Sequence, residues 1–316
     1  MNKNKDFEKN KILINLIKIL GEESVLFDEP LKNHTTIRLG GCTDFLVTPN
    51  NFEKIILTLE YLKSENINFF VIGNGSNLIF SDDGFCGVVI KINKNMNEIV
   101  VSDDFIISES GSMLPKISSF ALDNELSGIE FACGIPATVG GAVVMNAGAN
   151  GGEMKDIIEE SVFLNEDLEV CVIDKHSHNF SYRKSIFRDK KAIILKSTLK
   201  LKKMNKKTIE ERVRLFTLRR VENQPLDKPS AGSVFKNPSK DICAWELIEK
   251  SDLRGKKIGG ALISQKHAGF IVNDLNSTSK DVINLIKFVQ NAVYKKFNIM
   301  LKTEVKMVDK NGKEIF

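Results

Sequence analysis

Two glycine-rich segments in the first half of the chain have a composition typical of a binding site for a phosphate-bearing ligand. Residues 73–77, the Gly73 loop, read Gly-Asn-Gly-Ser-Asn, and residues 134–152, the glycine block, contain six glycines, one proline and no charged residue. Glycine contributes no packing and loses much conformational entropy on folding, so this density is tolerated where the backbone adopts positive φ or lies against a ligand. Pro136 suits the first turn of a short helix whose free N–H groups would face an anion.

Each segment also has a purely structural interpretation. The glycine block is compatible with a crossing of two packed elements, and the Gly73 loop with an ordinary hairpin. The loop does not fit a dinucleotide fingerprint, because Leu78 stands where that fingerprint needs glycine and residues 81–84 arrive too early for a long helix. We therefore expect strand, tight turn and strand, with an anion-binding nest formed by successive N–H groups and the side chains of Asn74, Ser76 and Asn77. Two such segments together favour a phosphate-bearing cofactor.

Five motifs follow one another in the order found in the UDP-N-acetylenolpyruvoylglucosamine reductase family, which the chain resembles from about Thr35 to Glu304. They are the Gly73 loop, the glycine block, Tyr182-Arg-Lys-Ser185, PSAGSVFKNP at residues 229–238 and KHAGFIVN at residues 266–273. The resemblance implies an α+β flavoenzyme with the vanillyl-alcohol-oxidase (PCMH) type of FAD fold, in two lobes, followed by an α+β substrate domain. This fold type explains why the Gly73 loop fails the dinucleotide test.

The chain departs from the family pattern at a few positions. Ala137 stands where a glycine is commoner, and Val144 and Asn150 stand where tyrosines often occur. These differences concern local packing around the flavin. The only tyrosines are Tyr61, Tyr182 and Tyr294, so none lies between the arginine motif and Ser233. The chain therefore resembles the branch of the family that lacks a tyrosine lid over UDP.

The resemblance implies reduction of UDP-N-acetylglucosamine enolpyruvate to UDP-N-acetylmuramate, a step of peptidoglycan precursor synthesis, with NADPH as reductant. Hydride would pass from N5 of non-covalently bound FAD to C3 of the enolpyruvyl group, and Ser233 would give a proton to C2. Arg183 would hold and polarise the substrate carboxylate with its planar fork. Glu304 would assist the same developing enolate, as a protonated acid or through water. Cys133, directly before the glycine block, is the only candidate there for covalent flavin attachment and is expected to be free.

The resemblance also implies which residues contact the ligands. FAD contacts are implied at Arg38, Gly73, Asn74, Gly75, Ser76, Asn77, Gly111, Gly134, Ile135, Thr138, Val139, Gly140, Gly141 and Ala142. Contacts with substrate or nicotinamide are implied at Tyr182, Lys236, Asn237 and His267. Without the resemblance, Arg183 would be one more surface charge and Glu304 an edge-strand carboxylate.

The length and composition of the chain restrict the class of protein that it can be. A chain of 316 residues with 42% hydrophobic content can bury more than one core, which fits a multidomain enzyme. The five cysteines are scattered without a C-x-x-C pair, which favours reduced thiols in a cytoplasm over a disulfide framework or a zinc site. His176 and His178 have no third ligand nearby in sequence, so we expect no metal. No apolar run reaches about eighteen residues, so we expect no membrane span. We also expect the protein to be a monomer.

Turn signals and hydrophobic periodicity divide the chain into three segments. Residues 1–92 and 93–203 are expected to form the two FAD-binding lobes, and residues 204–316 the substrate domain, whose strand at 299–308 returns toward the flavin. Helices are expected at residues 12–20, 52–65, 208–221, 242–251 and 279–297, and in the middle segment only at 114–126. Strands are expected on both sides of the Gly73 loop and around Phe45, Ile99, Phe105, Val162, Val170 and Ile193.

A nucleic-acid-binding protein is the rival from another class. Between Arg183 and Arg220 the chain has fifteen Lys or Arg against three Asp or Glu. The aromatic residues there are only Phe187 and Phe216, too few for a base-stacking platform. A solvated surface that steers anionic substrates is the more economical interpretation, so we expect no nucleic-acid partner.

The sequence also has features of two other kinds of enzyme. Ser233-Val-Phe-Lys236 matches the S-x-x-K of penicillin-binding proteins, where the motif begins a helix. Asn237-Pro238 prevents such a helix, and the companion S-D-N and K-T-G elements are absent. Another FAD-dependent oxidoreductase of the same fold is the nearer alternative.

Overall fold

The computed structural model describes residues 2–188, 190 and 192–315, and the chain divides into two compact units. Unit 1 comprises residues 1–26, 46–74 and 89–220, and unit 2 comprises residues 27–45, 75–88 and 221–316. The units are therefore interleaved along the sequence, whereas the three segments expected from the sequence are contiguous. Among the described residues, none of the helices is both long enough and apolar enough to cross a lipid bilayer.

The first sheet has the strand order β1-β2-β5-β3. These strands are β1 (Val25–Pro30), β2 (Cys42–Val47), β5 (Phe85–Lys91) and β3 (Phe69–Ile72). The boundaries between the two units fall within β1, β2 and β5. The strands expected near Phe45 and before the Gly73 loop are thus confirmed.

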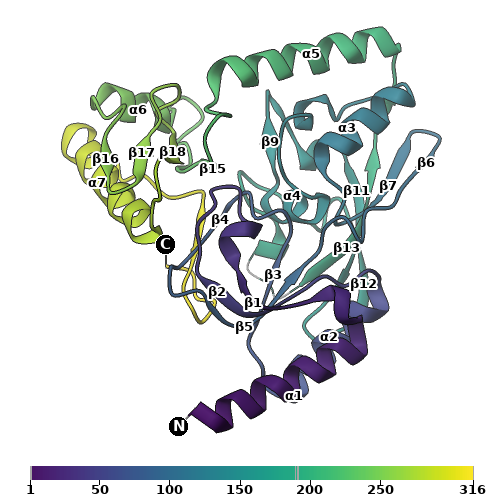
Figure 1. The fold of residues 1–316 in the computed structure, drawn as a ribbon. Helices are drawn as coiled ribbons and strands as arrows, with labels where there is room; N and C mark the ends of the chain where they lie inside the picture. The colour runs from purple at the N-terminus through teal and green to yellow at the C-terminus, as the bar shows by residue number, and fades with distance from the viewer. Residues whose placement is uncertain (1, 189, 191, 316) are drawn as a thin grey trace. The chain divides into compact units, whose positions relative to one another are not determined.

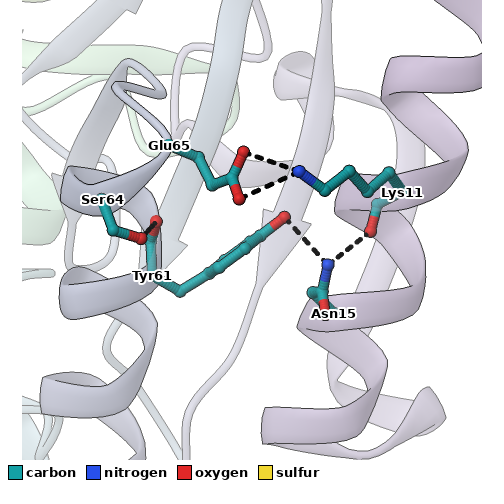
Figure 2. A network of polar contacts seen from close by, with 5 residues as sticks. All are labelled: Lys11, Asn15, Tyr61, Ser64 and Glu65. Atoms are coloured by element: carbon teal, nitrogen blue, oxygen red, sulfur yellow. Dashed lines mark hydrogen bonds and ion pairs between the residues drawn. The ribbon is translucent and has the colours of Figure 1, made fainter.

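Unit 1 begins with two helices that are joined by both apolar and polar contacts. Leu16 and Leu20 of α1 (Asn2–Leu20) are fully buried, as the apolar spacing of this helix predicts. Lys11 of α1 pairs with Glu65, which follows α2 (Phe52–Ser64), at 2.9 Å, and Asn15 donates to the Tyr61 hydroxyl at 3.3 Å (Figure 2). Both expected helices are confirmed.

The main sheet of unit 1 is antiparallel and has the order β12-β11-β13-β7-β6. All five expected strands form: β12 (Val170–Asp174), β11 (Ile158–Leu164), β13 (Ile193–Lys200), β7 (Phe105–Glu109) and β6 (Ile99–Ser102). The expected helix is α3 (Leu114–Asp123), which is amphipathic and contributes to the same apolar core.

The expectation that the middle segment contains only one helix is wrong. A second helix, α4 (Val139–Met145), forms inside the glycine block, where Pro136 indicated a short helical turn. Three of its residues, Val139, Ala142 and Val143, are fully buried in the core of unit 1. This burial supplies the stability that two consecutive glycines remove from a seven-residue helix.

Short elements complete unit 1. They are β8 (Leu126–Ser127) paired with β14 (Lys202–Lys203), β9 (Gly148–Ala149) paired with β10 (Gly152–Glu153), and the 3-10 helices Glu22–Ser24, Glu130–Ala132, Met154–Asp156 and Ile186–Arg188. A further 3-10 helix, Leu31–His34, belongs to unit 2. Helix α5 (Lys206–Asn223) includes the last residues of unit 1 and the first of unit 2.

Unit 2 is built on a second antiparallel sheet with the order β15-β18-β17-β16 (Figure 1). Its strands are β15 (Ser230–Ser233), β18 (Phe270–Asn273), β17 (Ala261–Ile263) and β16 (Lys257–Ile258). The expected helices α6 (Ala244–Lys250) and α7 (Ser279–Phe297) are confirmed and share the apolar core of this unit.

The long strand expected at residues 299–308 is shorter in the structure. Only β19 (Lys306–Val308) is regular, and it pairs in parallel with β4 (Leu78–Phe80), the strand after the Gly73 loop. The preceding residues instead pair irregularly with the segment after β15, through an isolated bridge between Phe235 and Thr303. The last segment therefore meets both the Ser233 segment and the strand that leaves the Gly73 loop.

Candidate active site

Most glycines of the glycine block are required by packing within unit 1. A Cβ on Gly134 would lie 2.5 Å from Cδ of Arg220, and one on Gly152 would lie 2.6 Å from Cδ1 of Phe131. A Cβ on Gly140 would lie 2.8 Å from the Cβ of Ser110. Among the glycines of the block, only Gly151 has positive φ. The structural alternative, a glycine-rich crossing of packed elements, thus accounts for much of the composition.

Gly141 and Gly151 are the exceptions, and a Cβ on Gly151 would have no neighbour within 4 Å. A Cβ on Gly141 would meet only the Thr138 hydroxyl oxygen, at the ordinary contact distance of 3.5 Å, and Gly141 is exposed. Helix α4 therefore presents one bare backbone position that its own unit does not cover. A flat ligand can approach the main chain closely at such a position.

The expectation that free N–H groups at the start of α4 face an anion is wrong. Val139 donates to the main-chain oxygen of Ser112 at 2.8 Å, and Gly140 to that of Ser110 at 2.9 Å. Gly141 donates to the Thr138 hydroxyl at 3.5 Å. The two main-chain acceptors, on Ser110 and Ser112, flank Gly111, where a Cβ would lie 2.1 Å from the main-chain oxygen of Asn93.

The Gly73 loop keeps its backbone donors. Within the described parts of the chain, the N–H groups of residues 74–77 donate no hydrogen bond to protein. Gly75 has φ of 65°, and a Cβ there would lie 2.1 Å from the main-chain oxygen of His34. Asn74 Nδ2 donates to the main-chain oxygen of Pro136 at 2.7 Å, and Asn77 Nδ2 to that of Glu304 at 3.1 Å. Among the described residues, the main-chain N–H groups and the Ser76 hydroxyl are left for the expected anion nest, while the amides of Asn74 and Asn77 brace the loop.

The other residues with an implied FAD contact differ in accessibility. Val139 and Ala142 are fully buried and present no surface to a ligand, and Thr138 is nearly so. Ile135 is half-buried in unit 1. Arg38 belongs to unit 2, is exposed and has φ of 57°. Only part of the implied FAD set is therefore accessible.

Arg183 lies in a tight turn of unit 1 in which Ser181 and Lys184 pair. Its φ is 55°, a left-handed conformation that is uncommon outside glycine. Nη2 of Arg183 donates to the main-chain oxygen of Gly148 at 3.1 Å, and its Cζ lies 5.0 Å from the centroid of the exposed Tyr182 ring. The guanidinium is therefore tied to the hairpin that follows α4.

Ser233 and Glu304 both belong to unit 2 and are brought together by main-chain bonds. Ser233 is exposed at the end of β15. The N–H of Glu304 donates at 2.7 Å to the main-chain oxygen of Val234, the residue after Ser233. The main-chain oxygen of Glu304 accepts the Asn77 amide, and the N–H of Lys306 donates to the oxygen of Asn77 at 3.0 Å. The expected proton donor, the expected acid and the Gly73 loop are thus consecutive in one hydrogen-bonded chain.

The expected substrate residues of unit 2 have identifiable structural partners. Asn237 Oδ1 accepts the N–H of Ala244 at 3.0 Å and thereby caps the start of α6. The half-buried Lys236 is held by its main chain, which donates to Lys302 at 2.9 Å. His267 Nδ1 accepts the N–H of Gly269 at 3.1 Å, so the neutral ring carries its proton on Nε2. Burial is the main cause that lowers the pKa of His267, and the nearby Arg254 guanidinium lowers it further.

Two rival functions can be compared with this geometry. Ser233 ends a strand and Phe235 pairs with Thr303, so the S-x-x-K segment does not begin a helix as a penicillin-binding protein would require. Several charges of the basic stretch are engaged within unit 1: Arg212 pairs with Glu130 at 3.5 Å and Lys206 with Asp123 at 3.0 Å. Across the described residues, no cluster of His, Cys, Asp and Glu could hold a metal ion.

Arg220 is a residue that the sequence reasoning missed. Its side chain lies over Gly134, and burial lowers the pKa of its guanidinium despite the nearby Cys133 thiol. Within the described parts of the chain, its guanidinium has no recorded hydrogen bond or ion pair. An uncompensated, partly buried cation beside the glycine block is suited to an anionic ligand. The bare Gly134 was the only sequence signal for this contact.

The chain matches two known family domains and several named proteins. Residues 43–172 match the FAD binding domain, and residues 224–308 match the C-terminal domain of UDP-N-acetylenolpyruvoylglucosamine reductase. Curated proteins named UDP-N-acetylenolpyruvoylglucosamine reductase include one from Caldanaerobacter subterraneus subsp. tengcongensis, 43% identical over 94% of this chain and 98% of its own. Another, from Clostridium tetani, is 42% identical over 98% of both chains.

A solved structure is also similar. The reductase of this name from Thermus caldophilus aligns with a TM-score of 0.76 and 33% identity, covering 90% of this chain and 97% of its own. The similarity therefore extends over nearly the full length of both proteins. It includes the FAD-binding segments and the C-terminal unit alike.

Proposed function

This chain belongs to the UDP-N-acetylenolpyruvoylglucosamine reductase family of FAD oxidoreductases, and we propose that it reduces UDP-N-acetylglucosamine enolpyruvate to UDP-N-acetylmuramate with NADPH. This reaction would supply a precursor of peptidoglycan. The similarity over 94% of the chain to a reductase of this name supports the substrate. The observation that carries the proposal is the hydrogen-bonded chain that joins the Ser233 segment, Glu304 and Asn77, all within unit 2.

The residues around the two glycine segments fit FAD. The Gly73 loop offers main-chain N–H donors that the described residues leave unused, as a pyrophosphate requires. Gly141 offers bare backbone, and Arg220 offers a cation that lacks a recorded partner among the described residues. When bound, FAD would accept a hydride from NADPH and deliver it to C3 of the enolpyruvyl group. Cys133 is a free thiol, which is compatible with non-covalent binding of FAD.

Ser233 would complete the reduction by giving its hydroxyl proton to C2. Addition of hydride at C3 places a pair of electrons on C2, and that carbon becomes a strong base. A serine hydroxyl is a weak acid, so the transfer depends on close and fixed geometry. The main-chain bond between Val234 and Glu304 supplies such fixation, while the Ser233 side chain stays exposed. Solvent would return the proton to the hydroxyl.

Arg183 and Glu304 would stabilise charge that spreads from C2 into the substrate carboxylate. The guanidinium has a planar fork that matches a carboxylate. The half-buried Glu304 would assist the same charge as a protonated acid or through water. Tyr182, Lys236, Asn237 and His267 would border the substrate or nicotinamide. We also propose a monomer in the cytoplasm.

The test is a two-step measurement on the purified protein. We expect a yellow protein that releases FAD on acid treatment, a flavin that NADPH bleaches, and reoxidation by the enolpyruvyl nucleotide with formation of UDP-N-acetylmuramate. NADH is the comparison for reductant preference. A flavin that NADPH reduces but the enolpyruvyl nucleotide does not reoxidise would identify a different FAD oxidoreductase. A colourless protein that takes up no FAD would reject the proposal entirely.

A further inference from the structure

Asn146, which ends α4, has a buried carboxamide whose polar groups are all used. It is 0% exposed and adopts the left-handed conformation, with φ of 44° and ψ of 55°. Its Nδ2 donates to Glu153 Oε2 at 2.8 Å and to the main-chain oxygen of Ser181 at 2.9 Å. Its Oδ1 accepts the N–H of Lys155 at 3.0 Å. Both amide hydrogens and the carbonyl are therefore engaged, which fixes the orientation of the side chain.

This single amide joins three segments of unit 1: the end of α4, the β9–β10 hairpin and the Ser181–Lys184 turn. Ser181 is the anchor of that turn, because its N–H donates to the oxygen of Lys184 at 2.9 Å and its oxygen accepts the N–H of Lys184 at 3.1 Å. The Asn146 amide occupies the remaining acceptor site of the Ser181 oxygen. The base of the turn that carries Arg183 is thus fixed from the protein interior.

The same amide also fixes the partner of the Arg183 guanidinium. Nη2 of Arg183 donates to the oxygen of Gly148, and Gly148 pairs with Glu153 across the β9–β10 hairpin. Glu153 is the residue whose carboxylate accepts the Asn146 amide. The Asn146 amide therefore contacts both segments that hold Arg183. One is the turn that carries its main chain, and the other is the hairpin that accepts a hydrogen bond from its guanidinium.

We propose that Asn146 is a positioning residue that holds the Arg183 guanidinium in its catalytic orientation; this inference rests on the function proposed above. Ser181, Tyr182 and Lys184 of the turn are exposed. Arg183 also adopts positive φ, a conformation that its own side chain does not favour. Arg188 Nη1 holds the turn at the main-chain oxygen of Arg183, and the Asn146 amide holds it from the protein interior at Ser181. A displacement of about 1 Å at a reacting group can cost roughly 10²-fold in rate.

Asn146→Asp is the informative substitution. It preserves the shape of the side chain and replaces two donors by an acceptor, which would face the Glu153 carboxylate and the Ser181 oxygen. Asn298→Asp is the matched control: Asn298 also ends a helix in the left-handed conformation, with φ of 55°, but it is exposed. Within the described residues, its side chain has no recorded hydrogen bond.

The experiment measures both half-reactions of the FAD-loaded protein by stopped flow, in a cycle with Arg183→Ala. In Asn146→Asp we expect flavin reoxidation by the enolpyruvyl nucleotide to slow roughly 10- to 10²-fold, with FAD content and reduction by NADPH within about twofold of wild type. In the Arg183→Ala background the same change should cost less than about threefold. Asn298→Asp should match wild type. Glu153→Ala, which removes a partly exposed partner of the amide, should show the same pattern if Asn146→Asp fails to fold.

Three results would overturn the inference. Equal losses in both half-reactions, or lost FAD, would mean that Asn146 serves the fold alone. Full additivity with Arg183→Ala would mean that the amide does not act through the arginine. An unimpaired Asn146→Asp beside an impaired Arg183→Ala would reject the positioning role and leave the proposed function intact. An unimpaired Arg183→Ala would instead reject the proposed role of Arg183, and the positioning role with it.

Discussion

The segments that would carry the chemistry are held in different ways in the two units. In unit 1, the Arg183 turn is fixed by side chains: Asn146 donates to Ser181, and Nη1 of Arg188 donates to the main-chain oxygen of Arg183 at 3.1 Å. In unit 2, the segments of Ser233 and Glu304 are fixed mainly by main-chain bonds, such as that from Glu304 to Val234, together with one side-chain bond from Asn77 Nδ2 to the main-chain oxygen of Glu304.

This difference determines where each unit is sensitive to substitution. Main-chain pairing survives almost any side-chain change, so sensitivity in unit 2 should be concentrated in the reacting groups themselves. Side-chain bonds are lost with the residue that makes them, so sensitivity in unit 1 should extend to residues that never touch a ligand.

Ser233→Ala should give the largest loss of activity, confined to one half-reaction. Without the hydroxyl, the proposed proton donor to C2 is lost, and a general acid contributes roughly 10²- to 10⁴-fold to rate. Flavin reduction by NADPH should stay near wild type. Ser230→Ala, in the same strand, is the control: its bond from Thr36 uses the main-chain oxygen and survives the change. Comparable losses in both half-reactions would indicate that Ser233 has only a structural role.

Arg183→Ala should lower kcat/KM by roughly 10²-fold or more, by analogy with the removal of an oxyanion donor. Arg183→Lys should rescue only partly, because a point charge lacks the bidentate fork. Lys184→Ala, at an exposed position of the same turn, should remain near wild type. Steady-state assays at saturating NADPH measure all three. Equal, salt-sensitive losses at both positions would mean that the basic stretch acts only as an electrostatic surface.

Periodicity was sufficient to predict the long helices but not the main-chain arrangement of the sites. The apolar spacing of α1, α2 and α7 repeats over several turns, so their positions could be predicted. Helix α4 contains two glycines in seven residues and has too little periodicity to be recognised. The strand at residues 299–308 looked continuous because alternation does not reveal where a strand changes partner.

The residues of the candidate site could also be predicted only in part from the sequence. The two glycine segments could be identified from composition, but composition does not separate a glycine that faces a ligand from one that faces its own chain. A Cβ on Gly140 would overlap Ser110, whereas one on Gly141 would meet only the Thr138 hydroxyl at an ordinary contact distance, although both are glycines of one short helix. Arg220 and Asn146 act through contacts with residues distant in sequence, and no motif marks such contacts. Their roles required the folded structure.

Gly140→Ala and Gly141→Ala should separate packing from ligand binding in unit 1. A methyl group on Gly140 would overlap Ser110, and such overpacking destabilises a fold by about 1–3 kcal/mol. A methyl group on Gly141 meets only an ordinary contact, so stability should be unchanged or higher, while FAD affinity should fall. Urea unfolding of the FAD-free protein and FAD titration measure the two effects. Unchanged FAD affinity in Gly141→Ala would show that the bare position of α4 faces no cofactor.

The smallest expected effect concerns pH and compares the buried histidine of unit 1 with that of unit 2. His178 is 0% exposed; its Nδ1 donates to the Asp174 oxygen at 2.6 Å, and its Nε2 accepts from the Ser161 hydroxyl at 2.9 Å. Burial lowers the pKa of His178 below its ordinary value of 6.5, and burial likewise lowers the pKa of the half-buried His267. In both cases the unfolded chain binds the proton more readily than the folded chain. The free energy of unfolding should therefore be fully retained above pH 6.5 and should fall as the pH drops below that value toward the lowered folded-state pKa.

The two histidines can be separated by substitution. Since His178 is the more deeply buried ring, His178→Gln should flatten the acid-side decline more than His267→Gln does, whatever each change does to stability at neutral pH. Urea unfolding between about pH 7.5 and pH 5.5 measures the slope for each variant, and His176→Gln, at an exposed position two residues from His178, is the control. An acid-side slope that His178→Gln leaves unchanged would place the proton-sensitive group elsewhere. A larger change in His267→Gln would reverse the contrast and make unit 2 the more acid-sensitive part.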